Sequence, residues 1–460
     1  MDVFKFSPLD FLFTCLGLIF LLLDIGLDIL AAVNFYQEKK YVSLGVLLLL
    51  LVASSVLVQA FSWLWYSYED YKRRTKVEKC LSPGQLKLLH VFQLGIYFRH
   101  ASVVETSVQS FFQNVGDYGS FAVYLSHDLS MLRLIETFSE SAPQVALMLT
   151  IILQQGKLEQ IAVLKALGSA SAIAFSVTMY HRSLRRFLPD KERQPVISSV
   201  VYFFWNLILI ASRITALALF ASVLPCFVFS HFFCAWLVLF FCAWRSKTDF
   251  MDSPGGEWLY RGTVATIWYF NWFNVVEGTT RNRTLLYHGY ILADISFLCS
   301  LWCWKIAYVE ISPLYASITA VSVVAVYILG LLVKIIYYKL YHPNLGRQEL
   351  KGDGERLETG QGPMTDTEDV VDSGLLPPER ESQDTDTDVT FKMCSGPSEP
   401  SPEIKVVRED AHITDGNGAQ SERASKHPVR SEGLTRPDSS AHSTEHCNKR
   451  MRKLAANFYS

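Results

Sequence analysis

Long apolar runs constrain the fold of this chain more than any other feature. Eight of them occupy residues 9–33, 42–66, 121–153, 161–180, 197–222, 226–244, 285–304 and 314–340. A helix of about 20 apolar residues crosses the roughly 30 Å hydrocarbon core of a bilayer, where backbone polar groups must be satisfied within the segment. Because 50% of the 460 residues are hydrophobic and 19% are charged, the sequence predicts an all-α polytopic membrane protein with about eight transmembrane helices.

Two further apolar segments are interrupted. The segment 86–115 contains His90, Arg99, His100 and Glu105, and the segment 258–276 is short and follows a Pro-Gly-Gly sequence. Both are typical of helices that enter the membrane without crossing it, or that lie in its plane. The order crossing, crossing, interrupted segment, crossing, crossing then occurs twice, which predicts two pseudo-repeated halves at about 9–180 and 197–340.

Loop charge predicts the orientation in the membrane. The loops 67–85 and 181–196 each contain five Lys or Arg residues, and basic loops stay on the cytoplasmic side. Both ends of the membrane domain, residues 1–343, are therefore expected in the cytoplasm. Residues 344–448 are rich in Gly, Pro, Ser, Thr and acidic residues, which predicts a disordered cytoplasmic tail.

Ionisable residues inside the apolar segments are the main functional signal, because each costs on the order of 2–3 kcal/mol to insert. They include Asp10, Asp24, Asp28, Arg99, Arg133, Glu136, Glu140, Arg213 and Asp294. Two interpretations remain open. The charges pair between helices and stabilise the bundle, or they form a hydrophilic path on which carboxylates attract the amine of a lipid headgroup and arginines attract its phosphate.

No catalytic or cofactor-binding motif accompanies these charges. The sequence contains no phosphate-binding glycine loop, zinc-binding histidine pair or nucleophile elbow, so we expect neither an enzyme nor a metal or other cofactor, and no nucleic-acid partner. A solute or amino-acid transporter and a non-conducting membrane scaffold stay open beside lipid movement. Cys226 and Cys303 are both expected near the outer surface, where they form a candidate disulfide.

The tail contains a protease pattern. In "EDVVDSG" (368–374), Asp369 and Asp372 hold the first and fourth places of a caspase site, and the small Ser373 follows the cleaved bond. The final segment 449–460 places Met451, Leu454 and Phe458 on one face of a basic amphipathic helix. We hypothesise that this segment covers the cytoplasmic side of the membrane domain until the chain is cut after Asp372.

Three long stretches resemble a known family. They are "MLRLIETFSESAPQVALMLTIILQQG" (131–156), "VYFFWNLILIASRITALALF" (201–220) and "TDFMDSPGGEWLYRGTVATIWYFNWFNVVEG" (248–278). They are similar to the XK-related membrane protein family, in its branch of caspase-activated phospholipid scramblases, over about residues 9–343.

The resemblance implies eight crossings with two re-entrant helices, and lipid scrambling without ATP or calcium that exposes phosphatidylserine on the plasma membrane. It also implies a C-terminal inhibitory segment removed by an executioner caspase, and a single-span immunoglobulin-type chaperone as partner. The intramembrane charges implied by the resemblance are Asp24, Asp28, Asp128, Glu136, Glu140, Arg213 and Asp294. In one departure, Met179 replaces the carboxylate that relatives have before Tyr180-His181-Arg182, so Arg182 is expected to pair differently.

Overall fold

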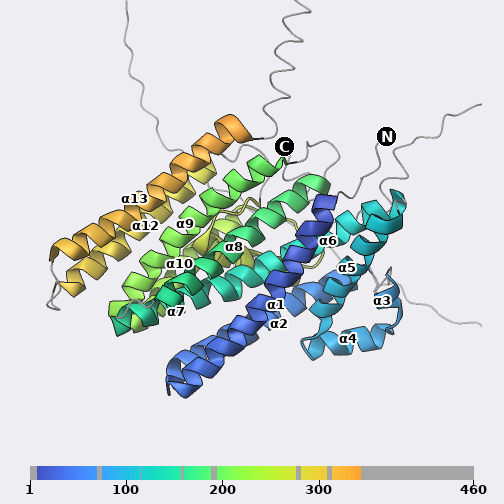
Figure 1. The fold of residues 1–460 in the computed structure, drawn as a ribbon, viewed down its shortest axis with the longest axis horizontal. Helices are drawn as coiled ribbons and strands as arrows, with labels where there is room; N and C mark the ends of the chain where they lie inside the picture. The colour runs from blue at the N-terminus through green and yellow to red at the C-terminus, as the bar shows by residue number, and fades with distance from the viewer. Residues whose placement is uncertain are drawn as a thin grey trace, which may run out of the picture. The chain divides into compact units, whose positions relative to one another are not determined.

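The computed structural model describes the backbone of residues 8–69, 75–113, 116–156, 160–187, 194–275, 281–307 and 313–342, all within one compact unit. Within these ranges every regular element is helical (Figure 1). The α-helices are α1 (Pro8–Gln37), α2 (Tyr41–Tyr68), α3 (Lys76–Lys79), α4 (Pro83–Val91), α5 (Gly95–Gln113), α6 (Gly116–Glu136), α7 (Ala142–Gln155), α8 (Gln160–Phe187), α9 (Val196–Val223), α10 (Pro225–Arg245), α11 (Pro254–Phe270), α12 (Arg281–Ile306) and α13 (Pro313–Ile336). Two π-helical segments, η1 (Thr137–Ser141) and η2 (Tyr337–Tyr341), follow α6 and α13. The prediction of an all-α membrane protein is confirmed at this level.

Six helical segments of the described chain are long and apolar enough to cross a membrane. They are Phe11–Gln37, Tyr41–Tyr68, Val196–Val223, Pro225–Arg245, Arg281–Ile306 and Pro313–Tyr341. They match six of the eight predicted crossings. The other two are also helical. The range 121–153 corresponds to α6, η1 and α7, and the range 161–180 corresponds to α8. These helices contain more charged residues, which lowers their hydropathy, so composition alone identifies six spans rather than eight.

The two interrupted segments also form helices. The first is divided between α4 and α5, and the second is α11. With 17 residues, α11 is about 26 Å long at 1.5 Å per residue, shorter than a hydrocarbon core of about 30 Å. Ser253 caps its N-terminus by accepting a hydrogen bond from the Gly256 amide. Its inner residues, including Val264 and Trp268, are buried against the bundle, as expected of a helix held inside the protein.

Helix α9 occupies the centre of the second half. It packs against α7, α8, α10, α12 and α13, and α12 and α13 lie side by side next to it (Figure 1). In its most apolar stretch 67% of the residues are buried, against 6% for α1. Gly330 of α13 permits close approach, since a Cβ there would lie 2.7 Å from Leu209 Cδ2 of α9. Small residues at such contacts are typical of membrane helices.

Candidate functional site

An excess of carboxylates surrounds one arginine where α1 meets α6 and η1. Arg133 Nη1 lies 2.7 Å from Glu136 Oε2, and its Nη2 lies 3.5 Å from Asp24 Oδ2. Carboxylate oxygens of Asp24, Glu136 and Glu140 all lie within 4.8 Å of one another. One guanidinium therefore accompanies three carboxyl groups, and we call this group the acidic cluster.

A π-helical segment places Glu140 in the acidic cluster. The helix from Gly116 changes to a π-helix at Thr137–Ser141 just before Pro143, which is the second residue of α7. Proline has no amide hydrogen and clashes with the preceding turn, and an inserted residue relieves this clash. The Ser139 hydroxyl, which donates to the Ile135 carbonyl at 2.8 Å, also contacts Ser54 of α2 at 2.8 Å. The sequence prediction treated 121–153 as one uninterrupted crossing and missed this change.

Cavities adjoin the acidic cluster on both sides of α1. One of about 390 Å³ is lined by Asp24, Asp28 and Arg133 with residues of α7 and α8. A second of about 470 Å³ is lined by Asp28, Glu136 and Glu140 with residues of α2 and α5. Asp28 lines both cavities, and each carboxylate of the acidic cluster lines one of them.

A third cavity of about 90 Å³ continues the first toward the N-terminal end of α1. The two share Phe20, Arg133 and Ser176. Together they follow α1 from Phe13 to Glu38, which is about 38 Å of helix and exceeds the hydrocarbon thickness. The linings of these two neighbouring cavities therefore extend along α1 over a length that is sufficient to cross a bilayer.

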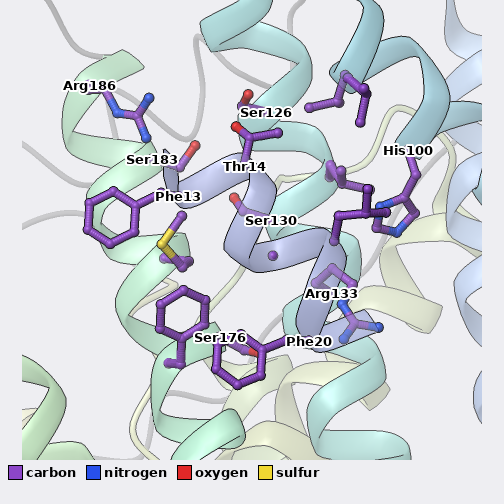
Figure 2. A pocket seen from close by; sticks show the side chains of 17 residues that line it. Phe13, Thr14, Phe20, His100, Ser126, Ser130, Arg133, Ser176, Ser183 and Arg186 are labelled. Carbon is purple, nitrogen blue, oxygen red and sulfur yellow. The ribbon is translucent and has the colours of Figure 1, made fainter. Parts of the chain in front are cut away.

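Hydroxyl groups line the third cavity. Figure 2 shows Thr14, Ser126, Ser130 and Ser183 around it, with the Arg133 guanidinium beside it. Ser126 Oγ and Ser183 Oγ are buried and have no hydrogen-bond partner among the described residues. Buried hydroxyls without partners are costly, so they are available to a polar group that enters the cavity.

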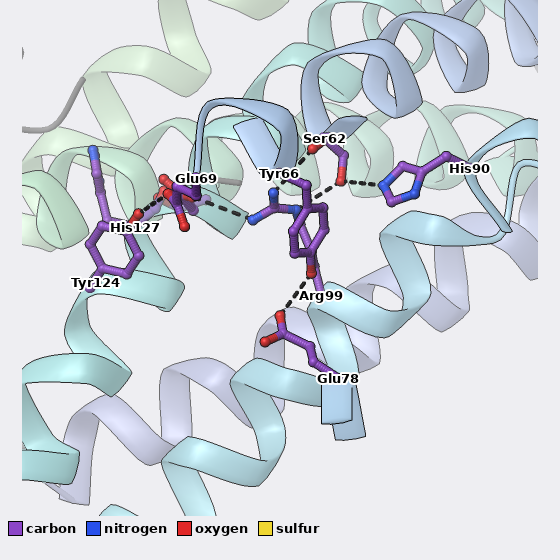
Figure 3. Close-up of polar contacts among 10 residues, drawn as sticks. Ser62, Tyr66, Glu69, Glu78, His90, Arg99, Tyr124 and His127 are labelled. Carbon is purple, nitrogen blue, oxygen red and sulfur yellow. Dashed lines mark hydrogen bonds and ion pairs between the residues drawn. The ribbon is translucent and has the colours of Figure 1, made fainter. Parts of the chain in front are cut away.

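A second charged group lies apart from these cavities. Arg99 of α5 donates from Nε to Ser62 Oγ at 2.8 Å and from Nη2 to the Ser62 carbonyl at 3.1 Å, and its Nη1 lies 3.4 Å from Asp128 Oδ2 (Figure 3). Its guanidinium carbon lies 3.9 Å from the Tyr66 ring centroid, and Tyr66 donates its hydroxyl hydrogen to Glu78 at 2.8 Å. The three guanidinium nitrogens and the face of this guanidinium thus all contact groups within the bundle.

The hydrogen bonds of His90 in the same network indicate which of its ring nitrogens carries the hydrogen. Its Nδ1 lies 2.8 Å from the Leu86 carbonyl, which can only accept, so Nδ1 carries the hydrogen and Nε2 accepts from the Ser62 hydroxyl at 2.9 Å. Burial lowers the pKa of His90 below its ordinary value, and the nearby charge of Arg99 adds to this. The imidazole is therefore neutral, as the hydrogen bonds require.

The third charged group lies in the second half. Arg213 of α9 is 0% exposed, and its Nη1 lies 2.5 Å from Asp294 Oδ2 of α12. His231 Nε2 contacts Asp294 Oδ1 at 3.0 Å, and His231 Nδ1 contacts the Tyr269 hydroxyl at 3.0 Å. Arg213 Nε donates to the Tyr269 carbonyl at 3.1 Å. We call these four residues the buried pair network. The sequence analysis missed His231 and Tyr269, since a single His or Tyr in an apolar run has no pattern to identify it.

The predicted charges therefore fall into three groups rather than one. Asp24, Asp28, Arg133, Glu136 and Glu140 come together, while Arg99 with Asp128 and Arg213 with Asp294 form separate pairs. The backbone of Asp10 lies in α1, but its side chain is outside the described residues. Other predicted residues also lie outside the described part of the chain, namely Asp369, Asp372, Ser373, Met451, Leu454 and Phe458.

The candidate disulfide between Cys226 and Cys303 is not formed in this structure. Both Cys226 and Cys303 are free thiols. Cys303 Sγ of α12 turns toward α13, where it donates to the Ala316 carbonyl at 3.4 Å, while Cys226 is exposed at the start of α10. Arg182, which lacks a carboxylate at position 179, instead donates to the Gln194 carbonyl at 3.1 Å and lies over the Phe13 ring.

Comparison with known proteins identifies the family. Residues 12–343 match the family described as XK-related protein. The chain is 45% identical over 359 residues to XK-related protein 8 of Tetraodon nigroviridis, covering 77% of this chain and 88% of the relative. It is 37% identical over 339 residues to XK-related protein 8 of Pan troglodytes, covering 73% and 84%. Identity to XK-related protein 9 of Tetraodon nigroviridis is 29% over 371 residues, covering 77% and 96%. The chain therefore belongs to the XK-related family of multi-span membrane proteins.

Proposed function

We propose that this chain is a phospholipid scramblase that moves lipid headgroups along the cavities beside α1. The observation that carries this proposal is the pair of neighbouring cavities whose linings extend from Phe13 to Glu38, with the acidic cluster at the middle. A zwitterionic headgroup is costly to move through hydrocarbon. Carboxylates that face its amine, and Arg133 and the hydroxyls that face its phosphate, lower that cost while the acyl chains stay in the membrane.

The proposed topology has eight crossings. The continuous helix from α6 to α7 and helix α8 are the two crossings beyond the six apolar spans, while α4, α5 and α11 do not cross the membrane. Both termini lie in the cytoplasm and the protein acts in the plasma membrane. Lipid then moves down its own gradient without ATP, and phosphatidylserine reaches the outer surface. The single-span immunoglobulin-type chaperone remains part of this proposal.

The proposed switch is cleavage after Asp372 by an executioner caspase. A tethered segment has a high effective concentration at its binding site, and cutting the tether removes that advantage. Residues 449–460 then leave the cytoplasmic side of the membrane domain, and the lipid path opens irreversibly.

Reconstitution in proteoliposomes tests the proposal. Purified protein should move a fluorescent phospholipid between leaflets only after caspase treatment, while Asp372→Ala should stay inactive under the same treatment. Deletion of 449–460 should give activity without caspase. Uptake of a solute with no lipid movement would instead support a transporter, and neither activity would support a scaffold.

A further inference from the structure

A fourth cavity lies among α8, α9, α11, α12 and α13 and takes no part in the path along α1. Its volume is about 250 Å³, and its lining includes Arg185, Trp205, His288 and Lys334, so we call it the basic cavity. These helices pack on one another around α9 (Figure 1). The cavity lies near the C-terminal ends of α8 and α13 and the N-terminal end of α12, which the proposed topology places on the cytoplasmic side.

Lys334 is a buried amine, and no carboxylate lies among the described residues that line its cavity. It is 8% exposed, its Nζ donates to His288 Nε2 at 2.7 Å, and it lies 5.0 Å from the Trp205 ring centroid. The other ring nitrogen of His288, Nδ1, contacts the Tyr327 hydroxyl at 2.9 Å. An ammonium carries three N–H groups, and the described residues supply an acceptor for one of them.

A second donor in the basic cavity also has no partner. Trp205 is 4% exposed, and its indole Nε1, which can only donate, has no hydrogen-bond acceptor among the described residues. The described lining also contains Arg185 and the imidazoles of His181 and His342, and it contains no carboxylate. Burying cations and donors in this way is costly unless an anion accompanies them.

We propose that the basic cavity is an anion site that binds a phosphate group. A phosphate offers several charged oxygens, which can accept from the Lys334 ammonium and the Trp205 indole at the same time. The volume is several times the roughly 30 Å³ that one water occupies in the liquid, so it holds a phosphate together with part of the molecule that carries it. Two carriers share this chemistry, namely an anionic lipid headgroup from the cytoplasmic leaflet and a soluble phosphate.

Equilibrium binding of radiolabelled inorganic phosphate to the full chain tests this site. The protein is held in nanodiscs of phosphatidylcholine. We expect saturable binding, weakened about tenfold or more by Lys334→Met, as loss of a charge-assisted hydrogen bond implies. Trp205→Phe, which keeps the ring and removes the N–H, should weaken binding severalfold.

The matched control is Lys305→Met. Lys305 Nζ lies 5.0 Å from the Trp304 ring centroid, the same distance as between Lys334 and Trp205, but outside the basic cavity, so this variant should bind phosphate like the parent. Adding phosphatidic acid to the nanodiscs identifies the carrier, because competition with inorganic phosphate indicates a lipid headgroup and its absence indicates a soluble phosphate.

Absence of saturable binding by the parent, to phosphate and to phosphatidic acid alike, would overturn the proposal. So would unchanged binding in Lys334→Met, and, if that variant does not fold, unchanged binding in Trp205→Phe. The phosphate-binding assay does not depend on lipid movement. A failure of the anion site therefore leaves the scramblase proposal standing, and a failure of the scramblase proposal leaves the anion site standing.

Discussion

Each half of the membrane domain places an arginine and an aspartate on different helices, but the surroundings differ. In the buried pair network, Arg213 is fully enclosed and Asp294 accepts from both Arg213 and His231. In the acidic cluster, Arg133 has more carboxylates around it than it can neutralise, and cavities adjoin them. The first arrangement stabilises the bundle and the second leaves charge available to a moving ligand. The same residue types thus support both interpretations of the sequence, in different places.

Arg213→Met should produce the largest loss of stability. It removes the arginine from Asp294 and leaves His231 as the remaining partner of that carboxylate, and breaking a buried ion pair costs about 3–5 kcal/mol. Thermal unfolding of the purified protein should show the loss. The double variant Arg213→Met with Asp294→Leu should recover much of it, because no unpaired charge remains. A single variant as stable as the parent would show that the network is not structural.

Arg99→Lys should have a smaller effect, about 2 kcal/mol. Lysine keeps the charge but cannot form the forked contacts to Ser62 and Asp128. Thermal unfolding measures it, with the exposed Lys87→Arg as control. If lysine replaces Arg99 without loss, the charge alone matters and the geometry of this group does not.

The pH dependence of stability should reveal His90. Its pKa is lowered in the folded protein, so the unfolded chain binds the proton first as the pH falls. The stabilisation is present above the ordinary histidine pKa of about 6.5 and falls below it, by at most about 1.4 kcal/mol per pH unit. His90→Asn should flatten this part of the unfolding profile between about pH 6.5 and 5. An identical slope in parent and variant would contradict the neutral imidazole.

Glu140→Gln should change stability least and lipid movement most. The amide keeps the shape and removes one of three close carboxylates, so we expect a stability change of less than about 1 kcal/mol. Scrambling by the caspase-treated protein should fall about tenfold, as loss of one charge-assisted contact implies. Asp252→Asn, at an exposed carboxylate outside the four cavities, should scramble like the parent. Equal rates for Glu140→Gln and the parent would place the path elsewhere.

Hydropathy predicted the helical fold and six of the spans, because crossing a bilayer imposes a length that a sequence shows directly. The pairing of Arg133 with Asp24, and of Arg213 with Asp294, depends on how distant helices pack, which spacing within one helix does not contain. Lys334 was missed for the same reason, since a single Lys in the run 314–340 has no local pattern that points to a cavity.

The central claim is that lipid headgroups pass along α1 through the acidic cluster. Its most direct test is photocrosslinking, with a phospholipid carrying a diazirine on its headgroup, in proteoliposomes of caspase-treated protein. Mass spectrometry then locates the modified residues. The account predicts crosslinks at mid-membrane depth on the cavity linings of α1, α6 and α8, near Phe20, Ser130 and Ser176. Mid-membrane crosslinks confined to α10, α12 and α13, with none on these linings, would contradict it.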